Sequence, residues 1–93
     1  MIIKLKIYFY SVFDKGDITL EFDEEATVGD VILELSRTYG GRFFEEYGKP
    51  LQEAFGQDFN VFLNDSYLRF PEDDNRRLND SDQFLISRPL SGG

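Results

Sequence analysis

Residues 26–41, ATVGDVILELSRTYGG, decide the fold, because they form the clearest helical pattern in the chain. Apolar residues recur there at positions i, i+3, i+4, i+7 and i+11, and they are Val28, Val31, Ile32, Leu35 and Tyr39. This spacing places them on one face of an α-helix. Thr27 is suited to cap its N-terminus, with Asp30 as capping-box partner, and Gly40 and Gly41 are predicted to end it. Such a helix needs a sheet to cover its apolar face.

Two segments of alternating polarity precede this helix. In residues 2–13 and 17–23, apolar side chains alternate with polar ones, with Ile18 and Leu20 in phase in the second segment. Alternation of this kind is typical of a strand with one face on a core. The sequence FDKGDI between the segments supplies a turn, in which Gly16 is free to take a positive φ. The sequence therefore predicts an antiparallel hairpin.

The segment directly after the helix, residues 42–58, has a less regular pattern. Its large apolar residues have helical spacing around GKP, and they are Phe43, Phe44, Tyr47, Leu51 and Phe55. We expect one or two short helical turns that pack over the edge of the core and fill it.

Three further strands are predicted in the last third of the chain. FNVFLND, residues 59–65, is a buried strand, and a turn then leads into a short strand that ends near Phe70. The polar loop PEDDNRRLNDSD follows, and QFLIS, residues 83–87, is the final strand. Pro89 is expected to end its pairing.

This order of elements predicts an α+β fold of the β-grasp, or ubiquitin-like, kind. One main helix would cover one face of a mixed sheet of four to five strands, with the first and last strands parallel at its centre. We expect one β-grasp domain over residues 1–88 and a flexible C-terminal diglycine tail over residues 89–93, since nothing in the sequence indicates a second domain or an internal repeat.

The net charge narrows the range of partners. The 93 residues carry 18 acidic and 10 basic side chains, a formal net charge of −8. This balance argues against nucleic acid, whose binding needs clustered Lys and Arg, and against an anionic membrane surface. It favours solubility and a basic protein partner, although adaptation to salt gives the same composition. With no visible signal peptide and no apolar run near the ~20 residues of a membrane span, we expect a cytoplasmic protein.

Residue types needed for most catalytic chemistry are missing. The chain has no Cys, His or Trp, so no bound cofactor, zinc site or Cys/His nucleophile is expected. The acidic loop in residues 72–82 lacks the mid-loop Gly and closing Glu of an EF-hand, so we interpret it as a solvated turn and expect no metal. The protein is therefore predicted to be a noncatalytic substrate or carrier.

The C-terminal residues fit such a role. The sequence ends PLSGG, and Gly92, Ser91 and Gly93 are small enough to thread a narrow channel in an enzyme. The α-carboxylate of Gly93 would be the reactive group once ATP had activated it as an acyl-adenylate. A chance tail or a cloning linker is the alternative interpretation.

Three stretches carry a family resemblance. They are ATVGDVILEL at the helix start, FNVFLNDSYL around a strand and turn, and LNDSDQFLISRPLSGG at the end. The whole chain resembles the β-grasp sulfur carriers and small archaeal ubiquitin-like modifiers, and most of all the small subunit of molybdopterin synthase. One departure is Arg88, where that subunit tends to be apolar.

The resemblance implies a mechanism and partners. A ubiquitin-activating-type enzyme would use ATP to adenylate Gly93, and a sulfurtransferase system would convert it to a thiocarboxylate. The tail would then enter the large subunit of molybdopterin synthase and donate sulfur to a pterin precursor. In the modifier branch, Gly93 would instead form an isopeptide bond with a lysine of a target protein.

Several other residues are candidates for partner contact. Arg88 is either a salt-bridge donor to the activating enzyme or a solvated charge, and Leu90, beside Pro89, is either an anchor in a partner pocket or idle. Strand phase places Tyr8 and Tyr10 on the sheet face away from the helix, together with Ile2 and Leu85. This face is either a partner surface or is covered by residues 42–58. A non-covalent β-grasp binding module that uses this face is the third functional hypothesis.

Overall fold

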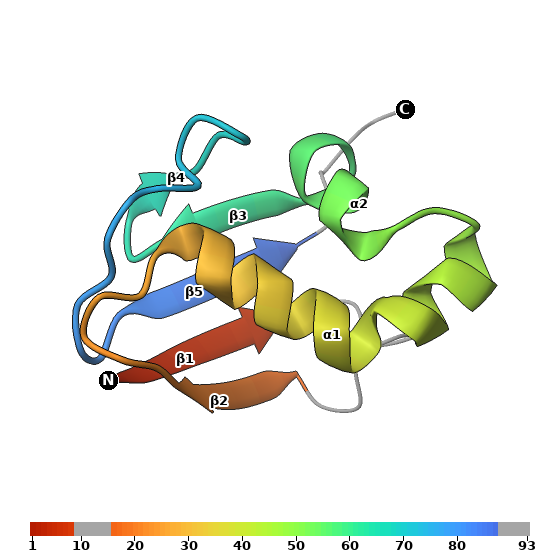
Figure 1. The fold of residues 1–93 in the computed structure, drawn as a ribbon. Helices are drawn as coiled ribbons and strands as arrows, with labels where there is room; N and C mark the ends of the chain where they lie inside the picture. Colours follow the sequence, from red (N-terminus) through yellow and green to blue (C-terminus); the bar gives the residue numbers. More distant parts are fainter. Residues whose placement is uncertain (9–15, 88–93) are drawn as a thin grey trace.

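A five-stranded mixed sheet carries one long helix across one of its faces (Figure 1). The computed structural model describes residues 1–8 and 16–87. The elements are, in chain order, β1 (Ile2–Ile7), β2 (Asp17–Glu21), α1 (Val28–Tyr47), α2 (Leu51–Gln57), β3 (Asn60–Leu63), β4 (Ser66–Tyr67) and β5 (Gln83–Ser87). The order of strands in the sheet is β2-β1-β5-β3-β4.

The pairing of the strands confirms the predicted β-grasp topology. β1 pairs antiparallel with β2, so that Leu5 lies opposite Ile18, and the first hairpin is as expected. β1 also pairs with β5 in parallel, with Leu5 opposite Phe84, which places the first and last strands side by side at the centre. β3 runs antiparallel to β5, and β4 adds a short edge strand. The two edge strands are shorter than the alternation predicted.

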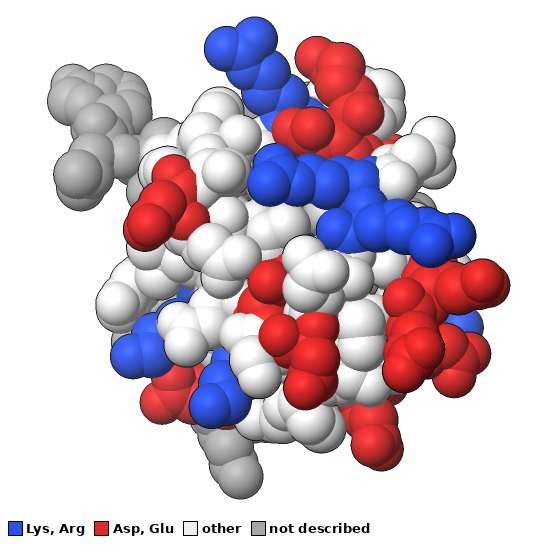
Figure 2. Space-filling view, turned by 90° about the vertical axis from the view of Figure 1, so that its left-hand side faces the viewer, with Lys and Arg blue, Asp and Glu red and all other residues white. Residues whose placement is uncertain are grey.

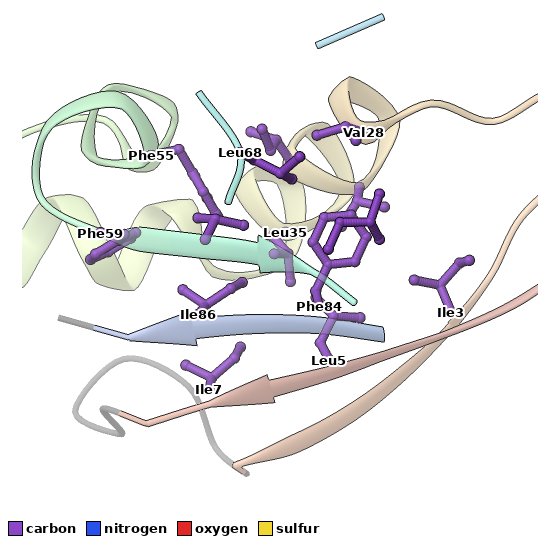
Figure 3. Packing of buried hydrophobic residues seen from close by; sticks show 14 of the residues in the cluster. Ile3, Leu5, Ile7, Val28, Leu35, Phe55, Phe59, Leu68, Phe84 and Ile86 are labelled. Atoms are coloured by element: carbon purple, nitrogen blue, oxygen red, sulfur yellow. The ribbon is translucent and has the colours of Figure 1, made fainter. Parts of the chain in front are cut away.

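The core lies between the sheet and the helices (Figure 3). Alternate residues of the central strands point toward α1, and all are nearly inaccessible to solvent: Ile3, Leu5, Ile7, Val61, Phe84 and Ile86. The predicted helix stripe meets them, with Val28, Val31 and Leu35 buried and Tyr39 packed at the margin. The spacing of apolar and polar residues along the chain thus determines which face of each element is buried.

The predicted end of the main helix is wrong. α1 continues through Gly40 and Gly41 and ends at Tyr47, where Gly48 takes the left-handed conformation at φ 73° and donates its N–H to the carbonyl of Phe44. The start is as predicted, because the carboxylate of Asp30 accepts the N–H of Thr27 at 2.9 Å. The low helix propensity of Gly40 and Gly41 is outweighed by the side-chain packing of the helical turn that follows them.

That packing comes from Phe43, which is buried against Phe59, with ring centroids 5.8 Å apart and planes at 81°. Phe55 of α2 meets Phe59 in the same edge-to-face manner at 5.4 Å. The expectation that residues 42–58 fill the core is confirmed for Phe43, Leu51 and Phe55, whereas Phe44 is exposed. Their helical structure is more extensive than one or two turns, because α1 runs into the segment and α2 adds seven residues.

Candidate functional site: the outer sheet face beside the end of β5

The predicted reactive tail follows β5, the central strand of the sheet. Arg88, Pro89, Leu90, Ser91, Gly92 and Gly93 lie outside the described residues, as does Tyr10. The end of β5 is well defined: Ser87 pairs with Asn60 of β3, and the N–H of Tyr8 donates to the carbonyl of Ile86 at 3.0 Å. β5 therefore ends between a residue that follows β1 and the first residue of β3.

A row of side chains crosses the outer face of the sheet, away from α1. The ladder places Lys6 opposite Leu85, Leu85 opposite Phe62, and Phe62 opposite Tyr67. Residues opposite each other in a ladder project to the same face. The rings of Phe62 and Tyr67 meet edge to face, with centroids 5.4 Å apart.

Tyr8 extends this row toward the end of β5. Ile3, Leu5 and Ile7 point inward, so the alternation directs Tyr8 outward, and its side chain is 58% exposed. We call Tyr8, Phe62, Tyr67 and Leu85 the outer patch. Aromatic residues with polar tips are enriched at protein interfaces, because they offer large contact area together with a hydrogen-bonding group.

Sequence reasoning found this face but not all of its members. Tyr8 and Leu85 were predicted, whereas Phe62 and Tyr67 were missed, although the inward phase of Val61 and Leu63 already implied that Phe62 points outward. Ile2 is on the same face but lies six residues from Tyr8, about 20 Å along the strand, with Lys4 and Lys6 between them.

The outer patch is not covered by α2: Tyr8 and Tyr67 are exposed, and Phe62 and Leu85 are half-buried. In Figure 1, α2 lies with α1 on the inner side of the sheet, and its Leu51, Ala54 and Phe55 belong to the core cluster. The alternative that residues 42–58 cover the outer face is therefore wrong.

A polar network holds the first residue of β5, Gln83, at the end of the strand away from the tail. Asn64, at φ 55°, donates its main-chain N–H to the carbonyl of Gln83 at 2.7 Å, and its side-chain oxygen accepts the N–H of Gln83 at 3.1 Å. The amide of Asn64 donates to Asp82 at 3.1 Å, and Asp82 also accepts the N–H of Asn79 at 2.7 Å. These residues belong to FNVFLNDSYL and LNDSDQFLISRPLSGG, two of the three stretches that carry the family resemblance. Their role in this chain is to anchor the strand that leads to the tail.

The acidic loop before β5 uses its carboxylates within the fold. Asp80 accepts the N–H of Ile2 at 2.7 Å, and Asp73 accepts that of Arg69 at 2.7 Å. Across residues 1–8 and 16–87, no three acidic side chains come together as metal ligands would. The helices in this part of the chain are too short or too polar to cross a membrane.

The family model of the ThiS family matches residues 8–93. The chain belongs to the ThiS family. A search of curated protein sequences found no match.

This ThiS-family protein shares its fold with solved structures of low sequence identity. SAMP1 from Haloferax volcanii superposes with a TM-score of 0.70 at 20% identity, covering 100% of both chains. The putative molybdopterin converting factor subunit 1 from Pyrococcus furiosus has a TM-score of 0.69 at 19% identity, covering 96% of this chain and 98% of that one. A complex of subunits 1 and 2 of the molybdopterin-converting factor from Helicobacter pylori gives 0.51 at 14%, with 100% of both chains covered. The chain thus combines membership of the ThiS family with the ubiquitin-like β-grasp fold of these structures.

Proposed function

We propose that this protein is a sulfur carrier whose working group is the α-carboxylate of Gly93. The carboxylate attacks the α-phosphate of ATP on a ubiquitin-activating-type enzyme, which releases pyrophosphate and leaves an acyl-adenylate. Hydrosulfide, supplied by a sulfurtransferase system, then attacks the acyl carbonyl and displaces AMP, and the product is a thiocarboxylate. The protein supplies no catalytic side chain and binds no cofactor of its own, and because the reaction uses ATP we place it in the cytoplasm.

The observation that carries this proposal is the family match, which extends over residues 8–93 and so includes the diglycine. Geometry adds support, because β5 ends at Ser87 beside the outer patch. Six residues connect Ser87 to Gly93, so covalent geometry keeps the carboxylate within about 20 Å of the end of β5. A partner bound to the outer patch would receive it within that radius.

We further propose a recipient for the sulfur. A chain of this fold is paired with a second subunit in the Helicobacter pylori complex, which supports a large synthase subunit as partner and a molybdopterin precursor as sulfur acceptor. The outer patch offers this partner Tyr8, Phe62 and Leu85, with Lys6 at its margin. Leu90 and Pro89 would make further contacts, and Arg88 would pair with an acidic group of the activating enzyme.

A second candidate function is protein modification, supported by the fold shared with SAMP1 over both full chains. A lysine amine would then displace AMP from the same acyl-adenylate and form an isopeptide bond to Gly93. The first step is common to both functions, so the two differ only in the nucleophile.

Mass spectrometry of the protein from its native cells tests the proposal. A C-terminal peptide with one oxygen replaced by sulfur establishes the carrier, and a Gly-Gly remnant on lysines of other proteins establishes the modifier. An unmodified Gly93 under all growth conditions contradicts both.

A pair of variants separates these functions from the non-covalent binding module. Deletion of Gly92 and Gly93 should abolish ATP-dependent adenylation and leave the outer patch intact. Leu85→Ser should weaken partner binding roughly tenfold, because it removes an apolar contact from the patch centre, with Lys4→Ala on the same face as control. If the protein is a non-covalent binding module, the deletion should leave partner binding unchanged, whereas Leu85→Ser should still weaken it roughly tenfold.

A further inference from the structure

A groove lies on the other side of the molecule, between the first turns of α1, α2 and the loop that follows β4. It is a hollow of about 510 Å³, within the usual range for binding sites. Its apolar lining includes Ile32, Leu33, Phe55 and Phe70, and its rim carries Glu53 and Asp74. We call it the helix-side groove.

The walls of this groove are held together in the unbound protein. The N–H of Gly29 donates to the carbonyl of Asp74 at 2.9 Å, and a Cβ on Gly29 would lie only 3.1 Å from that oxygen, so glycine permits this close approach. Phe70 meets Phe55 of α2 edge to face at 6.1 Å. A preformed groove avoids much of the ordering cost of binding.

Leu33 stands at the edge of the groove with 48% of its surface exposed. Its other side borders a second hollow, lined by Asp23, Glu25, Asp30, Glu34 and Arg37. Arg37 is paired with Glu34 at 3.1 Å. The linings of the two hollows that meet at this exposed leucine therefore include six carboxylates and one guanidinium, which is already paired.

Figure 2 shows acidic side chains at the lower right, on the side toward which α1 lies in Figure 1, with Lys and Arg side chains directly above them. With a net charge of −8, a second copy of this chain would be repelled from such a rim. An occupant must combine an apolar anchor with positive charge.

We propose that the helix-side groove docks a basic amphipathic segment of a partner protein. Apolar side chains of the segment contact Leu33, Phe55 and Phe70, and its Lys or Arg residues lie against the carboxylates of Glu53 and Asp74. The amide side chains of Gln52 and Gln57, which also line the groove, are available to the backbone of the segment. This site does not depend on Gly93 or on the outer patch, so the two faces can be occupied together.

The test is a titration of the ¹⁵N-labelled full chain with a synthetic helical peptide that carries leucines on one face and lysines elsewhere. We expect saturable NMR shifts centred on Leu33, Gln52 and Asp74. Two control peptides accompany it: one with the same residues scrambled so that the leucines share no face, and one with glutamate in place of lysine.

Variants assign the binding to the groove. Leu33→Ala should weaken the peptide roughly three- to tenfold, because it removes exposed apolar surface without touching the core. Glu53→Gln with Asp74→Asn should weaken it several-fold and reduce its salt dependence, whereas Leu85→Ala on the outer patch should change nothing. Equal binding of the scrambled peptide, shifts centred on the outer patch, or no shift at any soluble concentration would each overturn the proposal.

Discussion

The two faces of this molecule are built for different partners from the same few elements. The outer patch lies on the sheet, is aromatic and has lysines at its margin, whereas the helix-side groove lies between helices and has an acidic rim. Adjacent residues of one strand serve opposite faces, since Phe84 points to the core beneath α1 and Leu85 to the outer patch. The comparison shows how a small domain can use alternate residues of one strand for two purposes. One set stabilises the core, and the other forms a recognition surface.

The largest expected effect comes from this pair. Phe84→Ala should lower the free energy of unfolding by about 3–5 kcal/mol, because it leaves a cavity at a nearly inaccessible position beneath the helix. Leu85→Ala, its matched control, should cost about 1 kcal/mol or less, since its side chain lies on the outer face. Urea denaturation of both variants measures the difference, and similar losses would contradict the division between faces.

The next largest effect on stability concerns the polar network at the start of β5. Asp82→Ala should lower the free energy of unfolding by about 1.5–3 kcal/mol, because Asn79 and Asn64 lose their charged acceptor in a largely buried setting. Asp65→Ala, an exposed residue in the neighbouring turn, should change it by about 0.5 kcal/mol or less. The same denaturation experiment decides, and hydrogen exchange at Gln83 should rise only in the first variant.

Sequence patterns predicted the features that depend on burial. The inward phase of β1 and β5, the stripe of α1 and the parallel centre of the sheet all followed from alternation or helical spacing, because each residue was judged by its own neighbours in the chain. Tyr8 and Leu85 were placed on the outer face for the same reason.

Features that depend on contacts between distant segments were missed. Tyr67 joins the outer patch only because β4 pairs with β3, and the groove needs Gly29 to meet Asp74 across 45 residues. The extension of α1 likewise depends on Phe43 finding Phe59. Local propensity carries none of this information, which is why the glycine pair was taken for a helix end.

That error leads to the smallest predicted effect. Gly40→Ala should raise the free energy of unfolding by about 0.5–1 kcal/mol, because this residue is inside α1 and an added Cβ would meet nothing within 4 Å. Gly48→Ala should lower it by about 1 kcal/mol, because the helix ends there at φ 73°, a conformation that a Cβ disfavours. Thermal denaturation of the two variants gives opposite signs if α1 extends to Tyr47. Should the helix end instead at the glycine pair in solution, Gly40→Ala would be the destabilising change, and the anchoring of α1 by Phe43 would be wrong.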